Sequence, residues 1–265
     1  MIKRILTGLT LLGIGFFVIS SGGFWFWLWV SGVSLFCVYE LLAISMKPLP
    51  KSVAIVGFAV VGIAMVSVYF PQTRVYWQLA HIRFLSLTVV LLALVELASQ
   101  RLIFQEFMWL SVFRSVFLVS FTCPFIFLVR ELPDGRHWMF FCLVVLTASD
   151  TLALFGGKLF GRHQLSILSP KKTVEGSVIG FWGAMGIAWI AVSVGHLPVV
   201  PFMLAAVVMA VLSQVGDLHE SLTKRFFQVK DSSGFLPGHG GFYDRADSYL
   251  LAMPVVFYLV HAFFL

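Results

Sequence analysis

The sequence has 265 residues, of which 60% are hydrophobic and only 11% are charged, and its mean hydropathy is +0.97. Because a soluble domain carries about 25% charged residues, this composition excludes a disordered chain, a collagen, a disulfide scaffold and an ordinary cytosolic enzyme, and it predicts a protein of the lipid bilayer. The net charge of +6 is expected to orient the chain and to attract anionic headgroups, and nucleic acid is not expected as a partner.

A membrane-spanning helix takes about 20 residues, so the chain has room for roughly nine or ten spans. Nine apolar stretches are expected to be these helices: Ile5–Ser20, Gly23–Ser45, Ser52–Phe70, Phe84–Ala98, Phe104–Val129, Trp138–Phe155, Val174–Val194, Val199–Gly216 and Ser248–Leu265. The first stretch also resembles a signal peptide with a cleavage region at 20–22. Because many spans follow it, we predict that it is retained. The fold class is therefore predicted to be all-α and polytopic.

The basic residues divide unequally between the two sides of this nine-span arrangement. Thirteen fall on one side, namely Lys3, Arg4, Lys47, Lys51, Arg101, Lys158, Arg162, Lys171, Lys172, Lys224, Arg225, Lys230 and Arg245. Four fall on the other side, namely Arg74, Arg83, Arg130 and Arg136. The positive-inside rule then predicts a cytoplasmic N-terminus, cytoplasmic loops at 157–173 and 217–247, and an external C-terminus.

The fourth and fifth stretches are the least regular, because Glu96 ends one and Arg114 interrupts the other. An interfacial helix over Leu102–Phe113 is the alternative there. Residues 1–100 are expected to form an N-terminal group of transmembrane helices, and residues 101–265 a second transmembrane region with the cytoplasmic loops at 157–173 and 217–247. The chain has three cysteines, which are far apart in apolar runs, so we expect core residues and neither disulfides nor a zinc site.

Five of the twelve carboxylates lie in the 31 residues from Asp217 to Asp247. Glu220 and Lys224 follow Asp217 on one helical face, and Asp244 and Asp247 share another. Two such clusters would repel each other without a cation, and carboxylate oxygens suit Mg²⁺ with bound phosphates. The alternative is a solvated loop.

A second polar segment begins inside an apolar stretch at Asp150. An ionisable residue within a span indicates a functional site, although a structural hydrogen bond between helices is the alternative. Four basic residues follow, enough to neutralise a polyphosphate or, alternatively, to set orientation alone: Lys158, Arg162, Lys171 and Lys172. The glycine-rich segment 237–241 offers backbone amides for an anion, or it forms a simple turn.

Several segments resemble one family. They are Ser169-Pro170-Lys171-Lys172-Thr173-Val174-Glu175-Gly176, Gly216-Asp217-Leu218-His219-Glu220, Ser221-Leu222-Thr223-Lys224-Arg225, Lys230-Asp231-Ser232-Ser233 and Pro237-Gly238-His239-Gly240-Gly241-Phe242-Tyr243-Asp244-Arg245-Ala246-Asp247. Over roughly residues 145–255 the chain thus resembles the phosphatidate cytidylyltransferases, or CDP-diacylglycerol synthases; the first hundred residues match only in hydrophobic character. Val174, Thr223 and Ala246 depart from the family's usual residues, which affects the expected shape of the pocket but removes no charged group.

The resemblance implies that CTP and phosphatidate react to CDP-diacylglycerol and pyrophosphate, in phospholipid biosynthesis. It implies a site on the cytoplasmic face of a bacterial inner membrane, Mg²⁺ or Mn²⁺ with an additional monovalent cation, and a homodimer. The expected metal ligands are Asp217, Asp244 and Asp247, with Asp150 as a further candidate. Lys224 and Arg225 join these three aspartates as expected catalytic residues. The expected substrate-binding residues are Lys171, Lys172, Ser221, Lys230, His239 and Arg245.

Two other functions remain open from the sequence. CTP-dependent kinases of dolichol, phytol or another polyprenol resemble this family in the same carboxy-terminal motif, and a transporter is an alternative of another class. The Ser-Pro-Lys-Lys-Thr segment and the dense motif up to Asp247 favour cytidylyl transfer over phosphoryl transfer. Transport is disfavoured because the charges gather at one membrane surface. Pyrophosphate as the product would indicate cytidylyl transfer, CDP a kinase, and neither product transport or binding.

Overall fold

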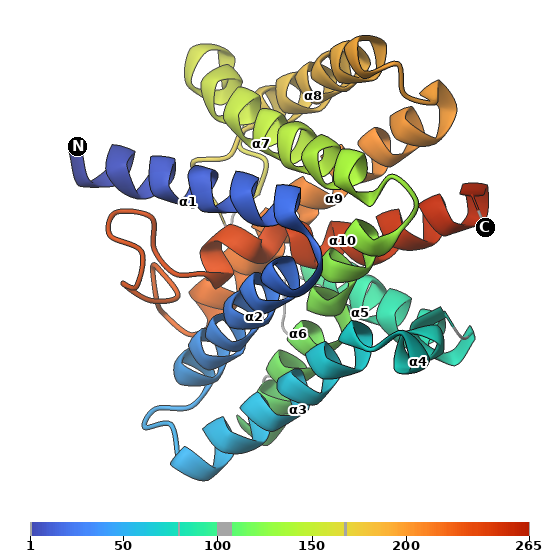
Figure 1. Ribbon diagram of the computed structural model, residues 1–265. Helices are drawn as coiled ribbons and strands as arrows, with labels where there is room; N and C mark the ends of the chain where they lie inside the picture. The colour runs from blue at the N-terminus through green and yellow to red at the C-terminus, as the bar shows by residue number, and fades with distance from the viewer. Residues whose placement is uncertain (1, 79, 100–107, 167–168, 265) are drawn as a thin grey trace.

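The computed structural model describes residues 2–78, 80–99, 108–166 and 169–264, and its regular elements there are helices (Figure 1). They are α1 (Ile2–Ser21), α2 (Gly23–Ser45), α3 (Lys51–Tyr69), α4 (Pro71–Arg74), the 3₁₀ turn η1 (Val75–Gln78), α5 (Ala80–Ser99), α6 (Met108–Glu131), α7 (Gly135–Phe160), α8 (Val174–Gly195), α9 (Val199–Phe226) and α10 (Tyr243–Phe264). The prediction of an all-α fold is confirmed. In a bilayer a helix satisfies its own backbone hydrogen bonds, so long apolar runs take this form.

Seven helices of the described chain are long and apolar enough to cross a membrane, namely α2, α3 and α6 to α10. In α1 and α5 the apolar helical parts are shorter, at residues 6–21 and 85–99. A multi-span membrane protein is therefore confirmed, whereas the count of nine spans and the orientation stay predictions. The start of the fifth expected stretch, Arg101 and the first half of the alternative helix Leu102–Phe113 lie outside the described residues.

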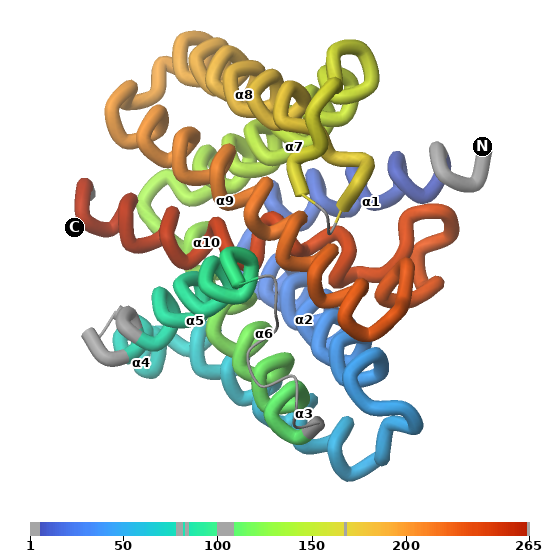
Figure 2. Tube along the Cα trace, turned by 180° about the vertical axis from the view of Figure 1, so that it is seen from behind, coloured from blue at the N-terminus to red at the C-terminus, as the bar shows by residue number. Residues whose placement is uncertain are grey.

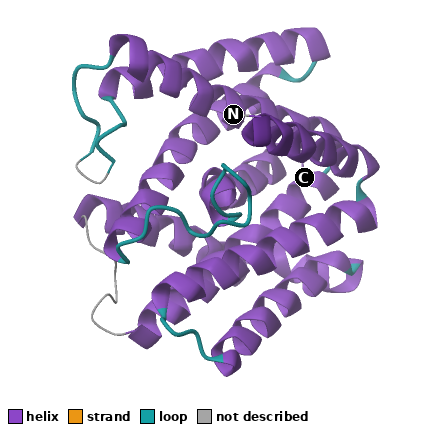
Figure 3. Ribbon diagram, turned by 90° about the vertical axis from the view of Figure 1, so that its left-hand side faces the viewer, coloured by secondary structure: helices purple, strands orange, loops and turns teal. Residues whose placement is uncertain are grey.

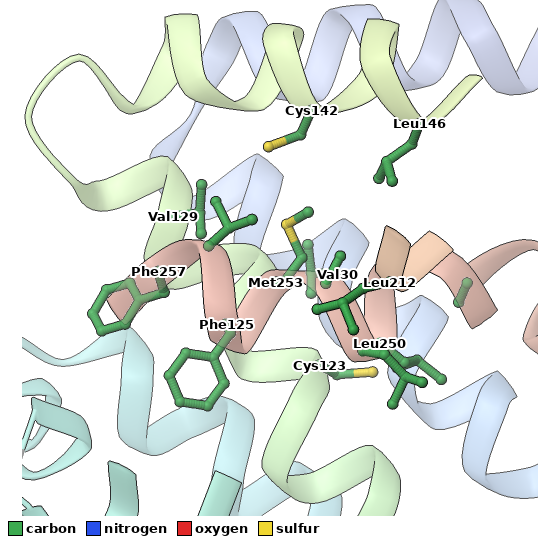
Figure 4. Close-up of a cluster of buried hydrophobic side chains, with 14 of the residues drawn as sticks. Val30, Cys123, Phe125, Val129, Cys142, Leu146, Leu212, Leu250, Met253 and Phe257 are labelled. Atoms are coloured by element: carbon green, nitrogen blue, oxygen red, sulfur yellow. The ribbon is translucent and has the colours of Figure 1, made fainter. Parts of the chain in front are cut away.

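Helix α10 lies at the centre of the packed core, in contact with α2, α5, α6 and α9. Figure 4 shows Met253 and Phe257 of α10 among side chains from the surrounding helices, including Phe125 of α6. Met253 and Phe125 have no exposed surface. The carboxy-terminal helix, which carries two of the expected site aspartates in its first turns, is thus fixed on several sides.

Helices α7 and α8 make the most extensive contact between any two helices of the described chain, and small residues allow their close approach (Figure 2). A Cβ added at Gly176 would lie 2.6 Å from the carbonyl oxygen of Ala153, and one at Gly180 would lie 2.7 Å from that of Ser149. Small residues are typical of such contacts between membrane helices. The contact fixes the amino end of α8 beside the carboxyl end of α7, where the second polar segment lies.

The two irregular residues of the expected fourth and fifth spans pair with each other. Arg114 on α6 donates to both carboxylate oxygens of Glu96 on α5, at 2.7 Å each. His219 on α9 lies 2.8 Å from the same carboxylate, and both members of the ion pair are largely buried. An ionised group inside a membrane protein needs such a partner, so Arg114 is accommodated within a long helix.

The nine-span arrangement makes a topological prediction. A cysteine or tag beside Lys171 or Lys230 should report the cytoplasm, and a tag after Leu265 should report the opposite side, because thirteen of the seventeen basic residues in loops and termini fall on the first side. Labelling with a membrane-impermeant reagent measures this. Finding both positions on one side would mean an even number of spans between them and would therefore contradict the nine-span arrangement.

Candidate active site

Two connecting segments lie on one side of the helix assembly, and the second of them lies beside α1 (Figures 1 and 3). The first, residues 161–173, joins α7 to α8, and the second, residues 227–242, joins α9 to α10 and faces the viewer in Figure 3. We call the second segment the signature loop. The Thr7 hydroxyl of α1 donates to the carbonyl oxygen of Pro237 in this loop at 3.4 Å. Both segments carry residues that the sequence predicted for the site.

Facing carboxyl groups link α9 to α10. A Cβ added at Gly216 would lie 2.5 Å from the carbonyl oxygen of Asp247, so the two helices approach each other through this glycine. The carboxyl group of Asp217 therefore meets that of Asp247, and one turn further along, Glu220 meets Asp244. The sequence predicted all three aspartates for the site, but the pairing of Asp217 with Asp247 follows from the packing.

Each carboxyl pair has a lysine beside it. Lys172, from the segment before α8, lies 2.7 Å from Asp217. Lys224, two turns after Asp217 on α9, forms ion pairs with Glu220 and with Asp244, the latter at 3.3 Å. Opposite charges at this distance offset the repulsion between neighbouring carboxylates. The sequence indicated both lysines, and the structure places each one against a different pair.

The described parts of this first segment, residues 161–166 and 169–173, lie against each other, which directs Lys172 toward α9. The backbone nitrogen of Leu165 donates to the carbonyl oxygen of Lys172 at 2.8 Å. Glu175, in the first turn of α8, accepts from the backbone nitrogens of Arg162 and His163 at 2.9 and 3.2 Å. Thr173 caps α8 by accepting from Gly176 at 3.1 Å. The Thr-Val-Glu-Gly part of the motif thus holds the loop and starts the helix.

Backbone amides of the signature loop surround the carboxylate of Asp244. The nitrogen of Gly241 donates to it at 2.9 Å, and the nitrogen of Ser232 at 3.1 Å. Gly240 has a φ of +79°, a conformation that favours glycine, and a Cβ there would collide with the Asp244 carboxylate. The glycines of the motif therefore allow the loop to wrap around Asp244.

A cavity of about 640 Å³ opens between these elements. Its charged lining residues are Asp150, Lys158, Lys171, Lys172, Asp217, Asp244, Arg245 and Asp247. Uncharged polar residues and the apolar side chains of Ala153, Leu154 and Leu165 complete the lining. Acidic groups, basic groups and an apolar wall thus face one space, as a phosphate-bearing lipid would require.

The other expected site residues do not line this cavity. Ser221 and Lys224 lie on α9, which continues as a helix to Phe226, ten residues beyond the end of the expected apolar stretch. Arg225 and Lys230 are exposed. His239 lies under α1, where a Cβ added at Gly8 would be 3.7 Å from its Nε2. Of these five residues, Lys224 reaches the cavity indirectly, because it contacts the lining carboxylate of Asp244.

The carboxylate oxygens that line the cavity provide some of the ligands that a Mg²⁺ ion needs. Among the described residues no three His, Cys, Asp or Glu side chains are grouped as a metal site. Mg²⁺, however, is usually held by one or two carboxylates together with water and substrate phosphates. The facing pair Asp217 and Asp247 provides such carboxylates, whereas the oxygens of Asp244 already accept hydrogen bonds from the signature loop.

Three further polar residues of this region were not predicted from the sequence. Glu40 on α2 accepts hydrogen bonds from the signature loop, and Ser177 and Gln214 line the cavity while bonding to each other across α8 and α9. Glu40 interrupts an apolar stretch just as Asp150 does, so the same rule for ionisable residues within spans would have identified it. Ser177 and Gln214 carry no such signal.

Comparison with known proteins identifies the family. A model of the cytidylyltransferase family matches residues 2–263. The chain belongs to this family. The match confirms the resemblance and extends it over the first hundred residues, so in this cytidylyltransferase α1 to α5 are part of the family's fold.

Relatives that bear an enzyme name cover nearly the same length. The chain is 28% identical to the phosphatidate cytidylyltransferase of Bacillus subtilis over 98% of both chains. It is 30% identical to that of Staphylococcus haemolyticus and 27% identical to that of Staphylococcus aureus (strain COL), each over 96% of both chains. Several relatives from different species thus share one enzyme name.

Proposed function

We propose that this protein is a phosphatidate cytidylyltransferase, which forms CDP-diacylglycerol and pyrophosphate from CTP and phosphatidate. The observation that carries the proposal is the cavity in which Asp217, Asp247, Lys171, Lys172 and Arg245 meet beside apolar side chains at the ends of membrane helices. Full-length relatives that bear this enzyme name support the same reaction.

The reaction joins two anions. An oxygen of the phosphatidate phosphate attacks the α-phosphorus of CTP, the bond from that phosphorus to the bridging oxygen of the β-phosphate breaks, and pyrophosphate leaves with the electron pair. The nucleophilic oxygen is already ionised, so a strong general base is not needed. Catalysis then consists mainly of alignment and of charge neutralisation, which is the work of Lys171, Lys172 and Arg245 in this proposal.

A divalent cation belongs to this proposal. Mg²⁺ or Mn²⁺ at Asp217 and Asp247 would neutralise phosphate charge and polarise a phosphoryl oxygen. Asp244 would hold the signature loop against the site, and Lys224 would hold Asp244. An additional monovalent cation, a homodimer, and a site that faces the cytoplasm from a bacterial inner membrane also belong to the proposal, on the sequence resemblance alone.

Purified protein in liposomes with phosphatidate and α-labelled CTP tests this function. We expect labelled lipid and an equal amount of pyrophosphate. CDP and a phosphorylated polyprenol, after addition of that alcohol, would support the kinase instead. No nucleotide product from either lipid would contradict both enzymes and leave binding or transport.

Replacing either Lys171 or Lys172 with Ala should lower kcat/KM. A lost charge-assisted contact is worth about 1.5–3 kcal/mol, which corresponds to a fall of about tenfold to over a hundredfold. The loss should be greater for Lys172, because it also neutralises Asp217. Lys47, which is exposed and does not line the cavity, provides the matched control. Normal kinetics of both variants would show that the two lysines serve orientation only.

A further inference from the structure

Glu40 is a fully buried carboxylate on α2, more than 190 residues before its partners. Its Oε1 accepts from the Ser233 hydroxyl at 2.5 Å and from the Phe242 backbone nitrogen at 3.0 Å. Its Oε2 accepts from the Ser232 hydroxyl and from the Tyr243 backbone nitrogen, both at 2.8 Å. Each oxygen therefore binds one hydroxyl and one backbone amide of the segment that carries the signature.

The two amides belong to the start of α10, which begins at Tyr243. The first amides of a helix have no partner within the helix, and the helix dipole favours a negative charge there. A side chain of the helix's own N-cap residue usually meets this need, but Phe242 precedes α10 and has no acceptor in its side chain. Glu40 caps α10 from another helix.

Residues of the signature loop connect the Glu40 carboxylate to the Asp244 carboxylate. Ser232 donates its hydroxyl to Glu40 at 2.8 Å and its backbone nitrogen to Asp244 at 3.1 Å. Gly241 donates its nitrogen to Asp244, and any Cβ on Gly241 would collide with the Glu40 carboxylate. Ser232 and Gly241 are thus held between the two carboxylates.

Aromatic contacts beside Glu40 fix the same loop. Phe36, one turn earlier on α2, stacks on Phe242 with ring centroids 4.7 Å apart and contacts Phe235 at 5.2 Å. These contacts bring the loop to α2 without directing its polar groups. The carboxylate contributes that direction, because hydrogen bonds depend on angle.

We propose that Glu40 is a positioning residue of the cytidylyltransferase: it caps α10 and orients the signature loop, and thereby sets the position of Asp244 at the cavity. The proposal rests on the proposed function for its activity assay. Its structural part, the restraint of the signature loop by Glu40, is measured independently of activity.

Replacing Glu40 with Gln tests the proposal with almost no change in size. An amide has one acceptor oxygen instead of two, and each oxygen of Glu40 binds one backbone amide, so the Gln amide group must face one of these two donors whichever way it is turned. A hydroxyl can rotate away, but a backbone N–H cannot. We expect kcat to fall about tenfold to a hundredfold, because the signature loop no longer holds Asp244 in place at the cavity, with the KM for phosphatidate nearly unchanged; each tenfold corresponds to about 1.4 kcal/mol of activation free energy.

A spin label reports the loop itself. A Cβ at Gly234 meets no atom within 4 Å, so Gly234→Cys can carry the label, and the three native cysteines are buried. In the Glu40→Gln background the label should become more mobile. Glu131→Gln is the matched control, because Glu131 is also a helix carboxylate but pairs with Arg74 and does not line the cavity. It should leave kcat and mobility unchanged.

Reduced kcat together with increased label mobility would support the proposal. Wild-type kcat in Glu40→Gln, or reduced kcat with an unchanged label, would overturn it, whereas an inactive wild-type protein would contradict the proposed function instead. If Glu40→Gln does not fold, the double variant Ser232→Ala, Ser233→Ala carries the test, because it keeps the carboxylate and the cap of α10. If the mobility of the label in that double variant equals its mobility in the wild-type background, the proposal would likewise be overturned.

Discussion

Asp217→Asn is expected to insert and fold normally while its cytidylyl transfer falls to near background at ordinary Mg²⁺ concentrations. The substitution keeps the size of the side chain but removes the charge of Asp217, whose carboxyl group faces that of Asp247. Removing the charge of Asp217 relieves its repulsion from Asp247 but also breaks the ion pair with Lys172, so the stability of the variant in the absence of Mg²⁺ should change little. Asp247→Asn should behave in the same way, because it removes the other half of the pair.

The measurements are activity and unfolding temperature against Mg²⁺ concentration. A ligand that binds only the folded state stabilises it, so Mg²⁺ should raise the unfolding temperature of the wild-type protein but not that of Asp217→Asn. Asp231→Ala is the control, since Asp231 is an exposed carboxylate in the same loop and should lose little activity. Wild-type curves for Asp217→Asn, Asp244→Asn and Asp247→Asn together would eliminate this metal site.

Asp244→Asn shows whether Asp244 holds the signature loop or binds the metal ion. If Asp244 mainly holds the signature loop, its Asn variant should lose stability as well as activity, because backbone amides of Ser232 and Gly241 lose an acceptor. Asp217→Asn should lose activity alone. A Mg²⁺-induced stabilisation that survives in Asp244→Asn would show that this residue is not a ligand.

Sequence alone predicts the helices of this protein well, because an apolar run in a bilayer has little choice but to form a helix. It also predicts which charged residues share a helical face, such as Asp217 with Glu220 and Asp244 with Asp247, since that depends only on the helical repeat. It does not predict that Asp217 faces Asp247. That register depends on the approach of α9 to α10 at Gly216, which is a property of packing.

The sequence also does not predict contacts between residues that lie far apart in the chain. Glu40 and the signature loop are separated by more than 190 residues, and Arg114 lies 105 residues from His219. No local spacing relates such residues. The sequence marks each as a charge within an apolar region, and thus as a residue that needs a partner, but only the fold shows that Arg114 and Glu96, two apparent irregularities, satisfy each other.

Arg114→Met is expected to destabilise the protein more than any substitution of a residue that lines the cavity. Removing one partner of a buried ion pair typically costs about 3–5 kcal/mol, because the other charge stays buried and uncompensated. The Arg114 and Glu96 side chains are only 11% and 3% exposed. The partly exposed pair of Arg74 and Glu131, at 22% and 24%, provides the comparison. Glu131→Gln should cost about 1 kcal/mol or less, because Arg74 keeps its hydrogen bonds to the carbonyl oxygens of Val68 and Tyr69.

The double variant Arg114→Met, Glu96→Leu separates the pair from simple loss of packing. If the cost of Arg114→Met arises from the stranded Glu96 carboxylate, removing that carboxylate too should restore part of the lost stability, since a buried ion pair replaced by apolar groups is often tolerated. Unfolding in mixed micelles, followed for both single variants and the double variant, measures the coupling. Additive losses would show that Arg114 and Glu96 contribute independently, and the stability of α5, α6 and α9 would then rest on apolar packing.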